Sequence, residues 1–164
     1  MLPFGYHNKG RVVTVQCSIE VMPENRIAYM RRTGPYGEGN YALMEGFKGW
    51  VKANGLFNKS AVILGISQDN PAATLPQSCR YDVCIVVPGG FIIRDDGIHE
   101  TKLPGGKYAV FTVAHTAEAV KTSWGEVFAE LSAKGLKPDT SRAAFERYKL
   151  FMVEKHLCEI CVPV

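Results

Sequence analysis

The chain has 164 residues, of which 46% are hydrophobic and 21% are charged, and its 19 Lys and Arg against 16 Asp and Glu give a formal net charge of +3. This length and composition predict a single globular domain and exclude a largely disordered chain. The charge excess is too small to indicate direct binding of nucleic acid. No apolar run approaches the about 18 residues of a membrane-spanning helix, and the N-terminus lacks a secretory signal pattern. We therefore expect a cytoplasmic protein without membrane contact.

The five cysteines do not suggest a disulfide framework, because their number is odd and no signal sequence precedes them. Cys158 and Cys161 form a CxxC, but it lies in LCEICVPV, which is typical of a strand. No second CxxC or HxxxH pair completes a zinc site. We expect reduced thiols in the core or in a pocket, with no metal and no cofactor.

In the first half, alternating apolar residues predict a strand over 12–21, a turn at Pro23 and a second strand over 26–33. A helix is expected from about Asn40, a plausible N-cap, to Asn54, with Gly55 ending it. Two further strands are expected over 61–67 and 80–87.

The second half gives the same order of elements. Strands are expected over 98–103 and 107–114, a helix over about 117–134 ended by Gly135, and final strands near 147–153 and 157–162. The basic run RAAFERYK at 142–149 is interpreted as a solvated edge.

Three weak internal matches, in the same order, indicate that the chain is duplicated. EVMPENRIA (20–28) aligns with TKLPGGKYA (101–109), WVKANGL (50–56) with ELSAKGL (130–136), and CIVVP (84–88) with EICVP (159–163). Repeat one would cover about 12–88 and repeat two about 97–163. We expect an α+β fold of two ββαββ units within one domain over 1–164, with no DNA-binding domain. Its eight-strand antiparallel sheet would carry two helices on one face and a ligand cleft on the other.

Strand alternation assigns side chains to the two faces of this sheet. Expected to face the helices are Tyr81, Val83, Ile85, Val87, Cys158, Ile160 and Val162. Expected on the open face are Asp82, Cys84, Val86, Glu159 and Cys161.

Glu159 is the main candidate for a functional side chain, because a carboxylate in a mostly apolar strand is costly to bury without a partner. Three interpretations stay open. It could be solvated, it could pair with a core Arg or Lys, or it could be a pocket acid that waits for a cationic ligand.

Aromatic residues could supply the walls of such a pocket, where apolar burial and cation–π attraction suit a lipophilic cation. Tyr29 and Tyr108 are candidates for the open face, Tyr36 lies in a Gly-rich loop, and Phe91 lies in the join between the halves. Trp124 falls on the apolar stripe of the second helix and can be either core or pocket wall.

The sequence resembles the GyrI-like small-molecule-binding domains, also known as the AraC-type effector-binding domain. The resemblance rests on RIAYMRRTGPYGEG, GFKGWVKANGL, RYDVCIVVPGGF, LPGGKYAVFTVAH, SWGEVF and EICVPV, in that order. It implies a pseudo-symmetric fold with a central cleft for hydrophobic, often cationic, compounds. It also implies a pocket acid on the closing strand, at Glu159, and aromatic walls at Tyr36, Tyr108 and Trp124.

Three functions of different classes follow from these residues and from the resemblance. The first is a binding module for lipophilic cationic small molecules. The second is a hydrolase of reactive electrophiles in which Glu159 activates water. The third is an inhibitor that binds a protein, such as DNA gyrase or a separate regulator. The sequence favours the first, because no residue that would orient Glu159 as a base is visible, and it leaves monomer and homodimer open.

Overall fold

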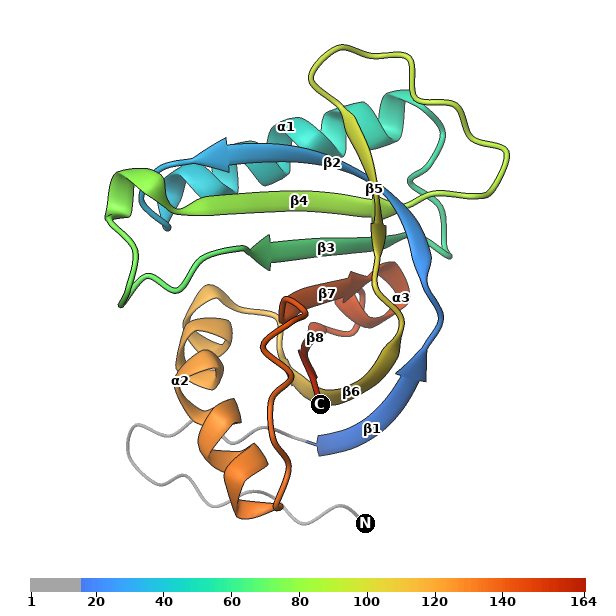
Figure 1. Cartoon of the computed structure of the whole chain (residues 1–164). Helices are drawn as coiled ribbons and strands as arrows, with labels where there is room; N and C mark the ends of the chain where they lie inside the picture. Colours follow the sequence, from blue (N-terminus) through green and yellow to red (C-terminus); the bar gives the residue numbers. More distant parts are fainter. Residues whose placement is uncertain (1–15) are drawn as a thin grey trace.

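The computed structural model describes residues 16–164, which form an α+β domain (Figure 1). The first half contains β1 (Gln16–Met22), β2 (Asn25–Thr33), α1 (Glu38–Ala53), β3 (Val62–Ser67) and β4 (Arg80–Val86), with a 3-10 turn at Pro76–Ser78. The second half contains β5 (His99–Leu103), β6 (Gly106–Ala114), α2 (Ala117–Ala133), β7 (Phe145–Lys149), α3 (Leu150–Val153) and β8 (Leu157–Pro163). The order strand, strand, helix, strand, strand therefore occurs twice.

The eight strands of the described residues form one antiparallel sheet in the order β1-β6-β8-β7-β3-β4-β2-β5. The two halves meet at its centre, where β3 pairs with β7 from Val62↔Lys149 to Gly65↔Glu146. They also meet at its ends, because β1 pairs with β6 and β2 pairs with β5 in one continuous register. The sheet is curled rather than flat (Figure 1), and each half adds one edge strand to the three central strands of the other.

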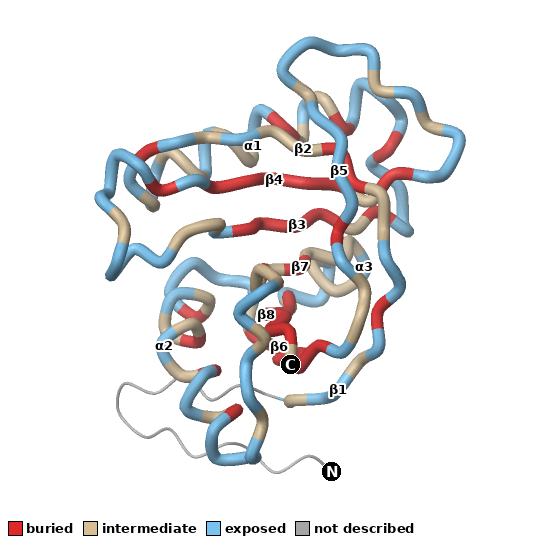
Figure 2. Tube along the Cα trace, in the orientation of Figure 1, coloured by how far each residue is buried: buried red, intermediate tan, exposed pale blue. Residues whose placement is uncertain are grey.

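The two long helices pack on the same face of this sheet, which we call the helix face. Phe47 and Val51 of α1 contact the side chains of β4, and Val127 and Leu131 of α2 contact those of β6 and β8. The face predicted for Tyr81, Val83, Ile85, Val87, Cys158, Ile160 and Val162 is confirmed. Figure 2 shows how burial concentrates along the central strands β3, β4 and β8.

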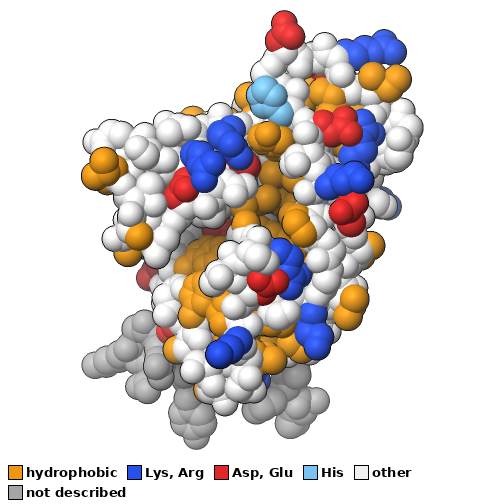
Figure 3. Space-filling view, viewed as in Figure 1, with side chains coloured by type: hydrophobic (Ala, Val, Ile, Leu, Met, Phe, Trp, Pro, Cys, Tyr) orange, Lys and Arg blue, Asp and Glu red, His pale blue; other side chains and the backbone are white. Residues whose placement is uncertain are grey.

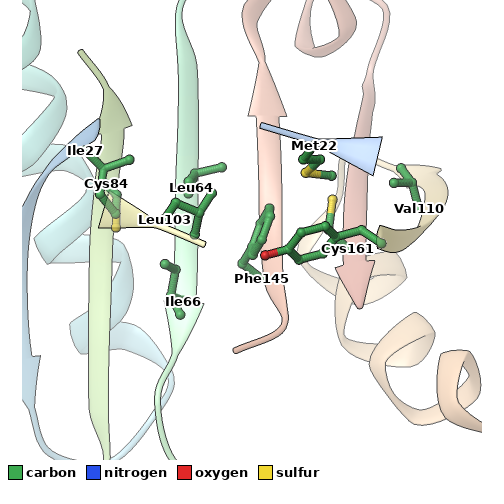
Figure 4. Packing of buried hydrophobic residues seen from close by; sticks show 10 residues of the cluster. Met22, Ile27, Leu64, Ile66, Cys84, Leu103, Val110, Phe145 and Cys161 are labelled. Carbon is green, nitrogen blue, oxygen red and sulfur yellow. The ribbon is translucent and has the colours of Figure 1, made fainter. Parts of the chain in front are cut away.

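The opposite face of the sheet is concave, and we call it the inner face. It encloses a third apolar cluster. Leu64 from β3 and Phe145 from β7 lie beside Met22 and Leu103, which come from the strands that cross over this face (Figure 4). Cys84 and Cys161 also belong to it. The crossing strands thus close the core on the side that the helices leave uncovered.

The sequence reading of residues 142–153 was wrong. The basic run RAAFERYK is not a solvated edge, because Phe145–Lys149 form β7 in the middle of the sheet, with Phe145 and Arg147 buried. The strand expected over 147–153 is β7 followed by the short helix α3.

The first helix begins earlier than expected, with Gly37 rather than Asn40 at its N-cap, and the Asn40 side chain instead accepts a hydrogen bond from Arg32. Gly55 follows the helix end with φ +67, a left-handed value that favours glycine. Strand residues 12–15 of the prediction lie outside the described residues.

Candidate functional site

Glu159 lies on the inner face and already has basic partners. Arg147, directly opposite in the β7–β8 register, donates from Nε to Glu159 Oε2 at 2.6 Å. Lys149 Nζ lies 3.5 Å from Glu159 Oε1, and Arg147 also bonds Glu20 on β1 at 2.8 Å. Of the three interpretations of Glu159, the structure realises pairing with a core Arg. This acid is not an open counter-charge for a ligand.

Four other predicted site residues share the inner face with Glu159, namely Tyr29, Tyr108, Cys84 and Cys161. Tyr108 is fully buried, donates its hydroxyl hydrogen to the carbonyl of Pro104 at 2.7 Å, and lies with its ring 4.9 Å from the Arg142 guanidinium carbon. Burial raises the pKa of the Cys161 thiol to about 12, so it stays protonated and inert at neutral pH. These residues pack the core of the inner face.

The remaining three predicted residues, Tyr36, Phe91 and Trp124, lie on the helix face. The Tyr36 ring meets Tyr81 edge-on at 6.3 Å, and its hydroxyl donates to the Arg80 carbonyl at 2.8 Å. Phe91 packs edge-on against Trp50 of α1 at 6.1 Å. The eight predicted residues therefore do not form one site but divide between the two faces of the sheet.

Trp124 leads to an acid that the sequence reading missed. Its indole Nε1–H donates to Glu146 Oε1 at 2.8 Å, and the Tyr148 hydroxyl donates to the other carboxylate oxygen. Glu146 and Tyr148 are two residues apart on β7, so both point to the helix face while their neighbour Arg147 points inward. Because β7 pairs with β3 of the first half, this carboxylate lies where the two halves meet, on the same face of the sheet as both helices.

Tyr81 and His115 complete this group, which we call the Glu146 cluster: Glu146, Tyr148, Trp124, Tyr81 and His115. The Tyr81 hydroxyl lies beside the Glu146 carboxylate, because both groups surround the Cα of Gly65 on β3. A Cβ built on Gly65 would lie 2.3 Å from Tyr81 Oη and 3.4 Å from Glu146 Oε2. His115 meets the Tyr148 ring edge-on at 5.5 Å. Burial lowers the pKa of His115, which favours its neutral form.

Glu146 is partly buried, and its carboxylate has no compensating cation among the described residues. Desolvation raises the pKa of Glu146, and the hydrogen bonds from Tyr148 and Trp124 oppose this rise. Within residues 16–164, no Lys, Arg or His forms an ion pair with it. Phe128, stacked on Trp124 at 6.4 Å and 45% exposed, connects the cluster to the surface. An acid with aromatic neighbours and no internal counter-charge can accept an organic cation.

A sequence signal for Glu146 was present but was outweighed. In FERYK, Phe145 requires burial, and a strand through it puts Glu146 and Tyr148 together on the other face. The three positive charges of the run 142–149 favoured a surface segment instead.

In the described part of the chain, no three His, Cys, Asp or Glu side chains gather as a metal site would require. The helices described here are all too short or too polar to cross a membrane.

Comparison with known proteins identifies the family. The family model of the GyrI-like small-molecule-binding domain matches residues 15–164. The SPbeta prophage-derived protein YosT of Bacillus subtilis, which is named as a transcriptional regulator, is 46% identical over 151 residues, covering 92% of this chain and 99% of its own. DNA gyrase inhibitor 2 of Dickeya dadantii is 29% identical over 135 residues, covering 79% of this chain and 82% of its own.

Among solved structures, SAV2435 bound to tetraphenylphosphonium is similar, with a TM-score of 0.61 at 20% identity, covering 92% of this chain and 94% of the other. This likeness confirms the fold. With the match over residues 15–164, it follows that the chain belongs to the family of GyrI-like small-molecule-binding domains.

Proposed function

We propose that the chain binds hydrophobic organic cations, and that Glu146 rather than Glu159 supplies the negative charge. The observation that carries this proposal is the partly buried Glu146 carboxylate, which has two neutral donors and no cationic partner within residues 16–164. Glu159, by contrast, is neutralised by Arg147 at 2.6 Å.

The surroundings of Glu146 suit the rest of such a ligand. Aromatic faces attract organic cations by cation–π interaction, and their area rewards the burial of apolar groups. Trp124, Tyr148 and Tyr81 adjoin the carboxylate, and Phe128 extends the aromatic surface outward. The tetraphenylphosphonium bound to the similar structure SAV2435 supports this class of ligand.

The first prediction is a thermal-shift measurement with tetraphenylphosphonium. Ligand binding to the folded state stabilises it by about 2.7 kcal/mol at a hundredfold excess over Kd, so the Tm of the wild type should rise. Glu146→Gln keeps the shape of the side chain and removes the charge, and we expect it to lose most of that rise. Glu154→Gln removes the same charge from an exposed position and should behave as the wild type.

An equal Tm rise in the wild type and Glu146→Gln would contradict the role of Glu146. If only Glu159→Gln lost the response, the ligand would lie on the inner face instead.

We propose binding without turnover, although an acid-assisted hydrolase is the alternative. Trp124 and Tyr148 each donate to one oxygen of Glu146, and both hydrogen bonds stabilise the ionised carboxylate, which opposes its uptake of a proton from water. Incubation with a reactive electrophile such as an epoxide or a strained cyclopropane should give no product above the buffer rate. Turnover that Glu146→Gln abolishes would establish the hydrolase.

A protein partner such as DNA gyrase or a separate regulator is a further proposal, supported by the names of YosT and gyrase inhibitor 2. Inhibition of gyrase supercoiling by the purified chain would test it. The five free cysteines fit a reducing compartment, and we propose the cytoplasm as the place of action.

A further inference from the structure

The inner face contains a cavity that the proposed function does not use, and its charges have the opposite sign to Glu146. The cavity has a volume of about 200 Å³. It is lined by Met22, Asn25, Val62, Leu64, Val86, Leu103, Phe145, Arg147 and Lys149. Six of these nine residues are apolar, two are cationic and one is an amide, and the lining contains no Asp or Glu from the described residues.

The cavity is open to solvent along part of its lining. Asn25, Val62, Val86 and Lys149 are each partly exposed, whereas Leu64 and Phe145 at its base are buried. The space-filling view of this face shows hydrophobic atoms at the bottom of a hollow, with charged side chains around it (Figure 3). A ligand could therefore place an apolar body inward and a polar head outward.

Lys149 is the cation available to such a head group. The guanidinium of Arg147 is already shared between Glu159 at 2.6 Å and Glu20 at 2.8 Å. The ammonium of Lys149 has three donor hydrogens, and within residues 16–164 it contacts one acceptor, Glu159 Oε1, at 3.5 Å. Glu159 keeps its shorter bond to Arg147 if Lys149 turns to another acceptor.

We propose that this inner cavity binds a small lipophilic carboxylate, with its oxygens at Lys149 and its hydrocarbon chain against Leu64, Val86 and Phe145. A carboxylate gains charge-assisted hydrogen bonds from the ammonium, and the Asn25 amide can donate a further one. A cationic head would meet the Lys149 ammonium and be repelled. The domain would then have two sites of opposite charge preference, one on each face of the sheet.

The test is isothermal titration calorimetry of the full chain with butanoate, hexanoate, octanoate and neutral octan-1-ol. Affinity should rise about fourfold per added methylene until the cavity is full, because each buried methylene contributes a near-constant transfer free energy. Octanoate should bind more tightly than octan-1-ol. A flat chain-length series, or equal affinities for octanoate and octan-1-ol, would overturn the proposal without any variant.

Variants locate the site. Lys149→Met keeps the aliphatic stem and should weaken octanoate at least about tenfold while leaving octan-1-ol unchanged. Lys155→Met, at an exposed position outside the cavity, should behave as the wild type. Val62→Phe, which fills the cavity from a partly exposed position, should abolish binding of both compounds.

The Tm of each variant serves as the folding control. Wild-type affinity of Lys149→Met for octanoate would refute the assignment. None of these titrations involves Glu146, so their outcome is independent of the response to tetraphenylphosphonium.

Discussion

At the scale of single residues, two glutamates on neighbouring strands have opposite roles because they face opposite sides of the sheet. Glu159 of β8 faces inward and meets Arg147, which lies across from it in the register. Glu146 of β7 faces the helices and, within residues 16–164, accepts hydrogen bonds from the neutral donors Trp124 and Tyr148. The same chemical group is therefore a structural ion-pair partner at one position and an uncompensated acid at the other.

Glu146 should cost stability in the absence of ligand. Its folded-state pKa lies above the ordinary value, so the unfolded chain loses this proton first as pH rises. The free energy of unfolding should fall as pH rises from the ordinary glutamate pKa through the raised one, and stay lower at neutral pH. Glu146→Gln cannot ionise and should be more stable than the wild type above that range.

Urea denaturation of both proteins between pH 4 and pH 8 measures this difference, and subtracting one curve from the other removes the contributions of other titrating groups. Glu154→Gln should show no such pH-dependent gain. A stability difference that is constant with pH would contradict an elevated pKa.

At the scale of elements, local signals predicted most helices and strands, and β7 shows where they fail. The run 142–149 has a basic composition, but its strand is covered on one side by β3 and on the other by β8. The partner β3 lies about eighty residues earlier in the chain. No local pattern reports that pairing, so the central position of Glu146 could not be predicted from its neighbours in sequence.

Helix α2 offers a matched pair of substitutions. Thr116 Oγ1 accepts the Ala119 N–H at 3.1 Å, so Thr116→Ala should destabilise the protein by about 1 kcal/mol through loss of this N-cap. Ser123 carries the one buried side-chain polar atom without a hydrogen-bond partner in the described part of the chain. Ser123→Ala should stabilise by about 1 kcal/mol, because burying an unpaired hydroxyl is unfavourable.

Chemical denaturation of the two α2 variants would measure both effects. Changes of the same sign would mean that the Ser123 hydroxyl has a partner, such as a bound water.

At the scale of the whole molecule, the two halves approach each other closely at one glycine. The strands β1 and β2 pair antiparallel with β6 and β5 in one register, and Gly105 lies between these two paired stretches. A Cβ built on Gly105 would lie 2.7 Å from Glu24 N and 2.8 Å from Met22 O. These are backbone atoms of the other half, which cannot rotate away as a side chain can. Close approach of the two halves therefore requires glycine here.

Gly105→Ala should destabilise the domain by about 1–3 kcal/mol, as overpacking does in a well-packed core. Gly89→Ala is the control, since a Cβ there meets no atom within 4 Å. Thermal unfolding of both variants measures the difference. Equal Tm values would show that the paired strands can move apart at this position without cost.

The sequence by itself determined the α+β class, the two-fold order of elements and the face of most strand residues, because these follow from local periodicity and turn residues. It also indicated the GyrI-like family, and it singled out Trp124. Only the tertiary structure decided which acid is uncompensated. Charge pairing depends on which strand lies opposite. Arg147 and Glu159 are twelve residues apart in the chain, and only the β7–β8 register places them face to face. The aromatic donors of Glu146 likewise come from α2 and β7, which only the folded sheet brings together.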